Sequence, residues 1–339
     1  MEATKEIKIG NKKEFKDIIF DIKWLTVLQT IAIYVFGVIG LCQLLIGQWK
    51  LLTILWTLLI FFVCGFSMSI GSHRMFGHRS FKTNRALKLF LIFGHTLSGQ
   101  WSIINWVRSH RAHHKYTDTA KDPTNIKNGF WFSHVYWMFW YSPAVKEAVM
   151  SIDVSDLKAD KDLMFQHNYY LPIHLLSVAI FPVMIPYLLW NEALWIAVFA
   201  NFARLLINLT QLSVFNSVVH MNGAKTYDEK ASAVENVLAI IFTFGEGFHN
   251  YHHTFPSDYK CGEFGDLKHF NLSACIIDWW AKHGWVTDRN EATASMVAQM
   301  KIKSGDGTHW FESENILSNP QWGHKDEQQI EDLFKNFDL

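Results

Sequence analysis

Three clusters of histidine stand out in this sequence because their residue type and spacing could bind metal ions. They are His73-Arg-Met-Phe-Gly-His78, His110-Arg-Ala-His113-His114 and His249-Asn-Tyr-His252-His253. In the second and third clusters, positions three and four apart share one face of a helix, which places their imidazoles side by side. The first cluster has a spacing of five, which is about 140° on a regular helix, so we expect a helix end there.

Neutral imidazole is a good ligand for iron, zinc and copper. Eight imidazoles exceed what a single ion with about four to six ligands requires, which favours a site for two ions. The alternative is that some of these histidines only cap helices or contact lipid headgroups. The recurrence of three clusters in one chain favours metal binding over that alternative.

Redox-active ions and dioxygen together can attack an unactivated alkyl chain, which no acid or base can do at neutral pH. Because zinc has no redox chemistry, iron is the favoured ion if the substrate is a saturated chain. Reduction of O2 to water takes four electrons, of which such a substrate supplies two. The sequence has no G-x-G-x-x-G nucleotide fingerprint and no His-Pro-Gly-Gly haem motif, so we expect the other electrons from a separate partner.

Four apolar stretches are long enough to hold these clusters at a membrane. A spanning helix needs about 20 apolar residues, and the candidates are Trp24–Ile46, Leu51–Ser72, Leu171–Trp190 and Ala193–Val219. Very short connections join the first pair and the second pair, which predicts two tight helical hairpins. We expect a further apolar stretch, Leu87–Ile104, to form an amphipathic or buried helix outside the membrane.

Basic residues indicate how these spans are oriented. The N-terminal stretch and the segment between the hairpins are rich in them, whereas the two hairpin turns hold one lysine between them. We therefore expect both termini and all three clusters on the cytosolic side. The expected division begins with an N-terminal segment (1–23), a first hairpin (24–72) and a first cap part (73–170). A second hairpin (171–219), a second cap part (220–300) and a polar tail (301–339) follow.

Other classes of protein fit this sequence less well. A soluble protein with two buried hairpins is disfavoured, because the apolar runs are too long for ordinary core helices. The net charge of zero gives no reason to expect a nucleic-acid partner. Four scattered cysteines do not indicate a disulfide framework, and we recognise no signal peptide.

The fourth apolar stretch is unusually polar along one face. Arg204, Asn208, Asn216 and His220 share one register of four, and polar side chains in a span usually face a cavity or the protein interior. Because His220 lies at the same end as the clusters, we interpret it as a ninth ligand and Asn216 as the holder of a bound water. We interpret Arg204 and Asn208 as a helix-packing face.

These motifs resemble those of the animal acyl-CoA desaturases. The resemblance covers about residues 20–290 and is carried by five stretches: 71–80, 105–116, 129–134, 245–256 and Asn216-Ser-Val-Val-His220. It implies an all-α integral membrane fold, with four transmembrane helices in two tight hairpins and a cytosolic helical cap that holds a di-iron site. It also implies a multi-pass protein of the endoplasmic reticulum membrane.

The resemblance further implies the roles of particular residues. Two Fe2+ ions would be bound by nine histidines, with no catalytic residue beyond these ligands: His73, His78, His110, His113, His114, His220, His249, His252 and His253. Gln100 and Trp106 would line a bent substrate tunnel, Phe61 and Gly65 would lie near its closed end, and Arg108 would lie near the CoA headgroup. The reaction implied is O2-dependent insertion of a double bond, expected at the delta-9 position, into a long-chain acyl-CoA. Electrons would arrive from NADH through a reductase and cytochrome b5.

The chain departs from the family pattern where the CoA headgroup would bind. Ser109 stands where the family has Asp, Lys127-Asn128 where it has a basic pair, and Trp140-Tyr141-Ser142 where it has a basic run. Ser213 stands where the family has a Trp that shapes the tunnel. The substrate and the position of the double bond are therefore open. A fatty acyl hydroxylase or an acetylene-forming enzyme on the same scaffold, a metal-handling membrane protein and an inactive scaffold are the alternatives.

Overall fold

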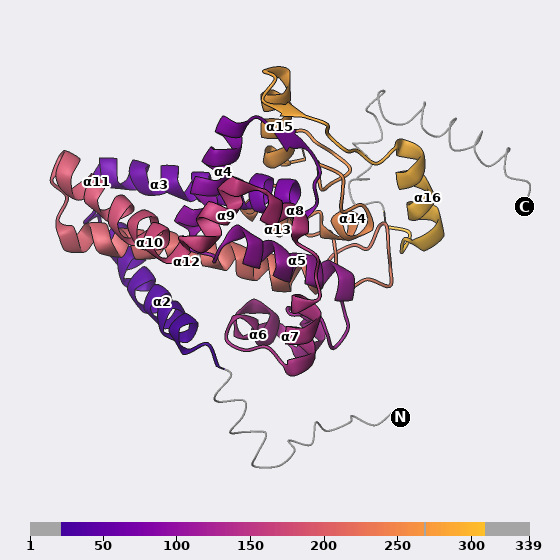
Figure 1. Ribbon diagram of the computed structural model, residues 1–339, viewed down its shortest axis with the longest axis horizontal. Coiled ribbons are helices and arrows are strands. Elements are labelled where there is room, and N and C mark those ends of the chain that lie inside the picture. The colour runs from indigo at the N-terminus through magenta and orange to yellow at the C-terminus, as the bar shows by residue number, and fades with distance from the viewer. Residues whose placement is uncertain (1–21, 268, 309–339) are drawn as a thin grey trace, which may run out of the picture.

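The computed structural model describes residues 22–267 and 269–308, and this part of the chain is almost wholly helical (Figure 1). Among the described residues, four helices are long and apolar enough to cross a membrane: Trp24–Leu45, Leu51–Gly77, Tyr170–Trp190 and Leu194–His220. The prediction of an all-α chain with four spans is therefore confirmed. The predicted N-terminal segment and most of the polar tail lie outside the described residues.

Each span consists of one or more helical segments. In chain order these are α2 (Trp24–Leu45), α3 (Leu51–Phe66), the π-helix η1 (Ser67–Gly77), α10 (Tyr170–His174), the π-helix η4 (Leu175–Ile180), α11 (Phe181–Trp190), α12 (Leu194–Ser217) and the 3-10 turn η5 (Val218–His220). Figure 1 shows the long helices gathered on one side of the molecule and shorter segments on the other.

The shorter segments form a cap around the histidines. They are α4 (Arg85–Ser98), α5 (Ile103–Tyr116), η2 (Ile126–Asn128), α6 (Phe130–His134), η3 (Tyr136–Met138), α7 (Pro143–Met150), α8 (Ser155–Ala159), α9 (Lys161–Asn168), α13 (Val237–Phe242), α14 (His249–Thr254), α15 (Leu272–Lys282) and α16 (Ala294–Ser304). Two short strands, β1 (Lys82–Thr83) and β2 (Val286–Thr287), pair antiparallel and join the two parts of the cap. The stretch 87–104, predicted as one helix, is α4 only as far as Ser98, because Gly99 in a left-handed conformation ends the helix and α5 begins at Ile103. At 14 residues, α4 is not among the candidate spans.

The spans expose apolar side chains that water would not tolerate as a continuous surface. Leu25, Leu28, Leu55, Leu59 and Leu188 are all more than half exposed. Lipid tails match such a surface, while the helices satisfy their own backbone hydrogen bonds. The exposed faces of α2, α3 and α11 are therefore suited to contact lipid.

α2 packs along α12 through small residues. A Cβ on Gly40 would lie 2.2 Å from the carbonyl oxygen of Phe199. The two backbones therefore approach more closely than any side chain at this position would allow. Close approach through glycine is the usual way in which helices associate in lipid, where burial of apolar surface supplies no driving force.

The two hairpin turns are bonded to each other at the end of the bundle remote from the histidines. The backbone N–H of Lys50 donates to Glu192 Oε2 at 3.0 Å, and Thr53 Oγ1 donates to the same carboxylate. In return, Lys50 Nζ donates to the carbonyl oxygens of Trp190 and Asn191, at 3.0 and 2.6 Å. These bonds satisfy the end of α11 and fix the register of one hairpin against the other.

The helix end expected at the first histidine cluster lies at His78, and the helix that leads to it is a π-helix rather than a regular α-helix. α3 continues directly into the π-helix η1, and the N–H of His78 donates to the carbonyl oxygen of His73, five residues back. Because a π-helix bonds residues five apart, it brings these two histidines to one face instead of separating them by about 140°. The spacing of five therefore presents two side chains together at the end of the span.

We predict that Gly40→Leu destabilises the protein, because the added side chain must separate α2 from α12. Overpacking of this kind costs about 1–3 kcal/mol, and a lower thermal unfolding temperature of the detergent-purified protein would report it. Val38→Leu is the matched control, since Val38 lies on the same helix and is 51% exposed. Equal unfolding temperatures for the two variants would contradict the role assigned to Gly40.

Candidate metal centre

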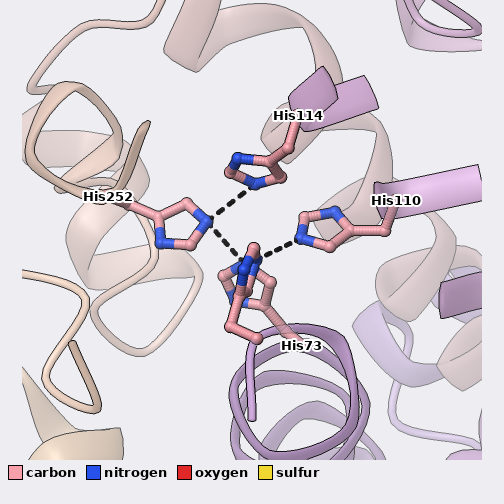
Figure 2. A group of neighbouring side chains, drawn as sticks. His73, His110, His114 and His252 are labelled. Atoms are coloured by element: carbon pink, nitrogen blue, oxygen red, sulfur yellow. Dashed lines mark hydrogen bonds between the residues drawn. The ribbon is translucent and has the colours of Figure 1, made fainter. Parts of the chain in front are cut away.

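The structure brings all nine predicted histidines together. His73 lies on η1 with His78 at its end, α5 carries three histidines, η5 carries His220 and α14 carries the last three. They form two groups whose ring nitrogens lie within 4.8 Å of one another: His73, His78, His110, His114 and His252, and His113, His220, His249 and His253. Figure 2 shows four imidazoles of the first group turned toward one shared space.

In both groups the imidazoles converge through the same atom, Nε2. In the first group, His252 Nε2 lies 2.9 Å from that of His73 and 3.0 Å from that of His114. In the second group, His249 Nε2 lies 3.0 Å from that of His220 and 3.1 Å from that of His253. The α5 histidines divide between the two groups, so one helix joins them.

The surroundings of His73 show why this arrangement fits metal ions. His73 Nδ1 faces the carboxylate oxygen Glu246 Oε2 at 2.7 Å, and this contact turns Nε2 the other way. Nε2 faces a space shared with several other Nε2 atoms. A neutral imidazole carries one ring proton, so hydrogen bonds can pair only some of these facing nitrogens. A cation can instead accept the lone pairs of all of them at once.

Glu246 is anchored independently of His73. Its Oε1 accepts from Arg74 Nε at 2.9 Å and from the Ser69 hydroxyl, and Arg74 Nη2 makes an ion-pair contact with it at 2.9 Å. Burial by itself would raise the pKa of Glu246, but the charge of Arg74 and the contact with His73 outweigh it and lower the pKa to about 2. The carboxylate is therefore ionised, and its Oε2 lies against the Nδ1 side of the His73 ring and orients it.

Asp122 plays the same part in the second group. Its Oδ1 lies 2.9 Å from His113 Nδ1 and accepts from the backbone N–H of Thr124 at 2.9 Å. Burial by itself raises the pKa of Asp122, yet the contact with His113 lowers it below its ordinary value. His220 Nδ1 is paired in turn with the hydroxyl of Ser232, at 2.8 Å. These partners fix which nitrogen of each ring faces the site.

The imidazoles are held in the form that binds metals. Burial lowers their pKa well below the ordinary value of 6.5, and neighbouring histidines lower it further, for His78, His110, His114, His249, His252 and His253. A group whose pKa is depressed in this way remains neutral at physiological pH, as a metal ligand must.

Two cavities meet beside the histidines. The first has a volume of about 500 Å³, which includes space open to solvent, and is lined by residues that include His73, Gly65 and Phe244. The second has a volume of about 480 Å³, counted in the same way, between α2, α12 and η3. Both are lined by Gln100, Trp106 and Leu212, so these side chains stand where the cavities meet. Gln100, Trp106 and Gly65 therefore line the cavities beside the histidines.

Three other predicted site residues lie elsewhere. Phe61 lines neither cavity and packs on Phe244, with ring centroids 5.8 Å apart. Arg108 lines neither cavity, and its Nη1 lies 3.7 Å from Met150 Sδ. The Nδ2 of Asn216 is buried and has no hydrogen-bond partner among the described residues, as a residue that holds a water molecule would be.

Sequence reasoning missed the residues that orient the ligands. Glu246 and Asp122 are acidic residues three positions before His249 and nine positions after His113, and this proximity was the only available signal. Arg74 and Ser232 gave no signal at all. Phe244 was also missed, and its ring occupies the space that a Cβ on Gly65 would enter, at 2.3 Å.

We predict that Glu246→Gln weakens metal retention about 10- to 100-fold, because an amide leaves the His73 ring without its ionised partner. Metal content of the purified protein, measured during dialysis against graded chelator, reports the loss. Glu192→Gln is the matched control, since Glu192 is as buried but lies at the opposite end of the spans. Identical metal retention in both variants would refute the role of Glu246.

Comparison with known proteins identifies the family. Residues 49–275 match the family described as Fatty acid desaturase. The chain is 38% identical over 290 residues to stearoyl-CoA desaturase 5 of Bos taurus, which is 85% of each chain. It is 40% identical over 268 residues to stearoyl-CoA desaturase of Homo sapiens, 78% of this chain and 74% of that protein.

A third relative carries a different name on the same framework. The (11Z)-hexadec-11-enoyl-CoA conjugase of Bombyx mori is 36% identical over 286 residues, 84% of this chain and 86% of that protein. The family match over 49–275 covers α3, the second hairpin and all three histidine clusters. The family match and these relatives confirm the resemblance found in the motifs, and the chain belongs to the fatty acid desaturase family.

Proposed function

We propose that this protein is an acyl-CoA desaturase that holds two iron ions, one in each histidine group, and consumes O2. The observation that carries the proposal is the division of nine buried or half-buried imidazoles into five and four beside two cavities that share Gln100, Trp106 and Leu212. With iron bound, O2 chemistry would remove one hydrogen from each of two neighbouring carbons. The relatives named stearoyl-CoA desaturase support an acyl-CoA substrate.

The side chains around the cavities would position the chain and exclude water. Trp106 and Gln100, at the meeting point of the cavities, would impose a bend on the acyl chain next to His73. The remaining lining is mostly apolar and would keep water from the reacting carbons. Glu246 and Asp122 would keep the imidazoles in one orientation throughout.

The chain departs from the family pattern where the CoA headgroup would bind, and two of the residues found there contact each other. They are Ser109 and Tyr141, whose hydroxyl oxygens lie 3.2 Å apart. Lys23 Nζ lies 3.6 Å from the centroid of the Tyr141 ring, and burial lowers the pKa of this lysine to about 8. We propose that this altered surface still receives a CoA thioester.

We further propose a double bond at the delta-9 position and cytochrome b5, with its NADH-dependent reductase, as the electron donor. The supports are the resemblance of the motifs, the names of the relatives and the lack of a haem or nucleotide motif in the sequence. We also propose that the protein lies in the endoplasmic reticulum membrane, which the resemblance implies, and that both termini are cytosolic, which the distribution of basic residues favours.

A hydroxylase or an acetylene-forming enzyme is the alternative function, because the same site would serve it. The conjugase named among the relatives supports the view that one framework yields more than one product. Mass spectrometry of the product separates these functions. A hydroxylated chain gains an oxygen atom, whereas a desaturated chain only loses two hydrogens.

We predict that expression in a cell lacking its own acyl desaturase restores monounsaturated acyl chains, and that His113→Ala does not. His113 belongs to the second histidine group, and its loss should remove one ligand without disturbing the spans. Lipid profiling reports chain length, position and geometry, and membrane fractionation verifies that the variant inserts. Turnover by inserted His113→Ala protein would exclude the ligand role.

We predict that Gly65→Ala shifts the product profile toward shorter chains. The new methyl group would lie 2.3 Å from the Phe244 ring, which must move and reshape the first cavity that both residues line. Adding Phe244→Val to this variant should restore the original chain length by returning the space. A profile unchanged by Gly65→Ala would refute the placement of the tunnel end.

A further inference from the structure

Two buried amide side chains line the first cavity in the part that it does not share with the second cavity. Asn208 is 4% exposed and Gln211 is 8% exposed, and both lie on α12 and line the cavity. Asn208 precedes Asn216 by eight residues, which is about 12 Å along the helix. A saturated acyl chain offers these amides no hydrogen bond, and burying an unpaired polar group against it is unfavourable.

The direction of the hydrogen bonds between these amides is fixed at one end. Gln211 Nε2 donates at 2.8 Å to the carbonyl oxygen of Phe242, which can only accept. Gln211 must therefore present its Oε1 to Asn208, and Asn208 Nδ2 donates to it at 3.2 Å. This leaves Asn208 Oδ1, which is buried and has no partner among the described residues. The unpaired atom of this cavity-lining side chain is therefore an acceptor.

We propose that the acyl chain accepted by this protein carries a hydroxyl group in its methyl-terminal half, which donates to Asn208 Oδ1. The proposal rests on the proposed function and specifies its substrate class. An existing double bond cannot fill this role, because it has no N–H or O–H to donate. A site built to pair with a hydroxyl discriminates against the chain that lacks it, since the buried acceptor is then left unpaired.

The other polar groups that line the first cavity do not compete for this role at the same place. The Thr243 hydroxyl donates to the carbonyl oxygen of Ala239 at 2.5 Å, and the Ser69 hydroxyl donates to Glu246. Gln100 Oε1 and Glu246 Oε2 are two further buried acceptors without a hydrogen bond among the described residues, and both residues line the first cavity. Gln100 also lines the second cavity, and Glu246 Oε2 lies 2.7 Å from His73 Nδ1, so each would meet a part of the chain other than the one beside Asn208.

The test is a competition between substrates for the wild-type protein in membranes supplied with electron donors. A saturated acyl-CoA competes with chains of the same length that carry a hydroxyl at successive positions from the methyl end. We expect kcat/KM to be about tenfold higher for one hydroxylated position than for the saturated chain. Preference for the saturated chain over every hydroxylated one would overturn the proposal, as would equal values.

Variants assign the preference to Asn208. Asn208→Leu has a similar volume and no acceptor, so we expect the value for the hydroxylated chain to fall about tenfold and that for the saturated chain to rise. Thr210→Val is the control on the same helix, because the Thr210 hydroxyl donates to the carbonyl oxygen of Leu206 and lines neither cavity. A preference that persists in Asn208→Leu would overturn the assignment.

The outcomes also separate this proposal from the function on which it rests. Desaturation of the saturated chain without any preference refutes the hydroxyl site and leaves the desaturase function standing. If wild-type protein that retains its metal turns over none of the chains, the desaturase function itself fails. The substrate competition needs no variant, so a folding defect in Asn208→Leu cannot hide a negative result.

Discussion

The structure depends on holding nine imidazoles with their Nε2 atoms facing one another in a largely buried site. Without cations these lone pairs are crowded together, and with cations they are good ligands. The rings can be held there only if the opposite nitrogen of each key ring is fixed. Glu246 and Asp122 do this, and Arg74 keeps Glu246 ionised inside the protein.

This requirement explains several features that are unusual for helices. η1 adopts π-helical geometry at the end of a span and so presents His73 and His78 on one face. α5 lies between the two groups and supplies ligands to both. The joined hairpin turns and the close contact at Gly40 hold the spans that carry η1 and η5 in one register.

The same framework leaves the substrate cavity free to vary. The ligands and their partners surround one end of the first cavity, whereas Gly65, Phe244 and Asn208 shape the rest of it. Gly65 and Phe244 pack as a small residue against a large one, because a Cβ on Gly65 would lie 2.3 Å from the Phe244 ring. Changes there alter which chain fits without touching any imidazole. This separation accounts for a family whose members carry different names for their products.

The sequence by itself determined the spans and the candidate ligands, because apolar length and histidine spacing are local properties of the chain. It also identified Gln100, Trp106 and Gly65 through the resemblance, and all three line the cavities. Only the tertiary structure decided the division into five and four, the π-helix at His73, and the direction of the Asn208 hydrogen bond. Those features depend on contacts such as that between Arg74 and Glu246, which are 172 residues apart. No local pattern encodes such pairs, since they form only when the spans and the cap pack together.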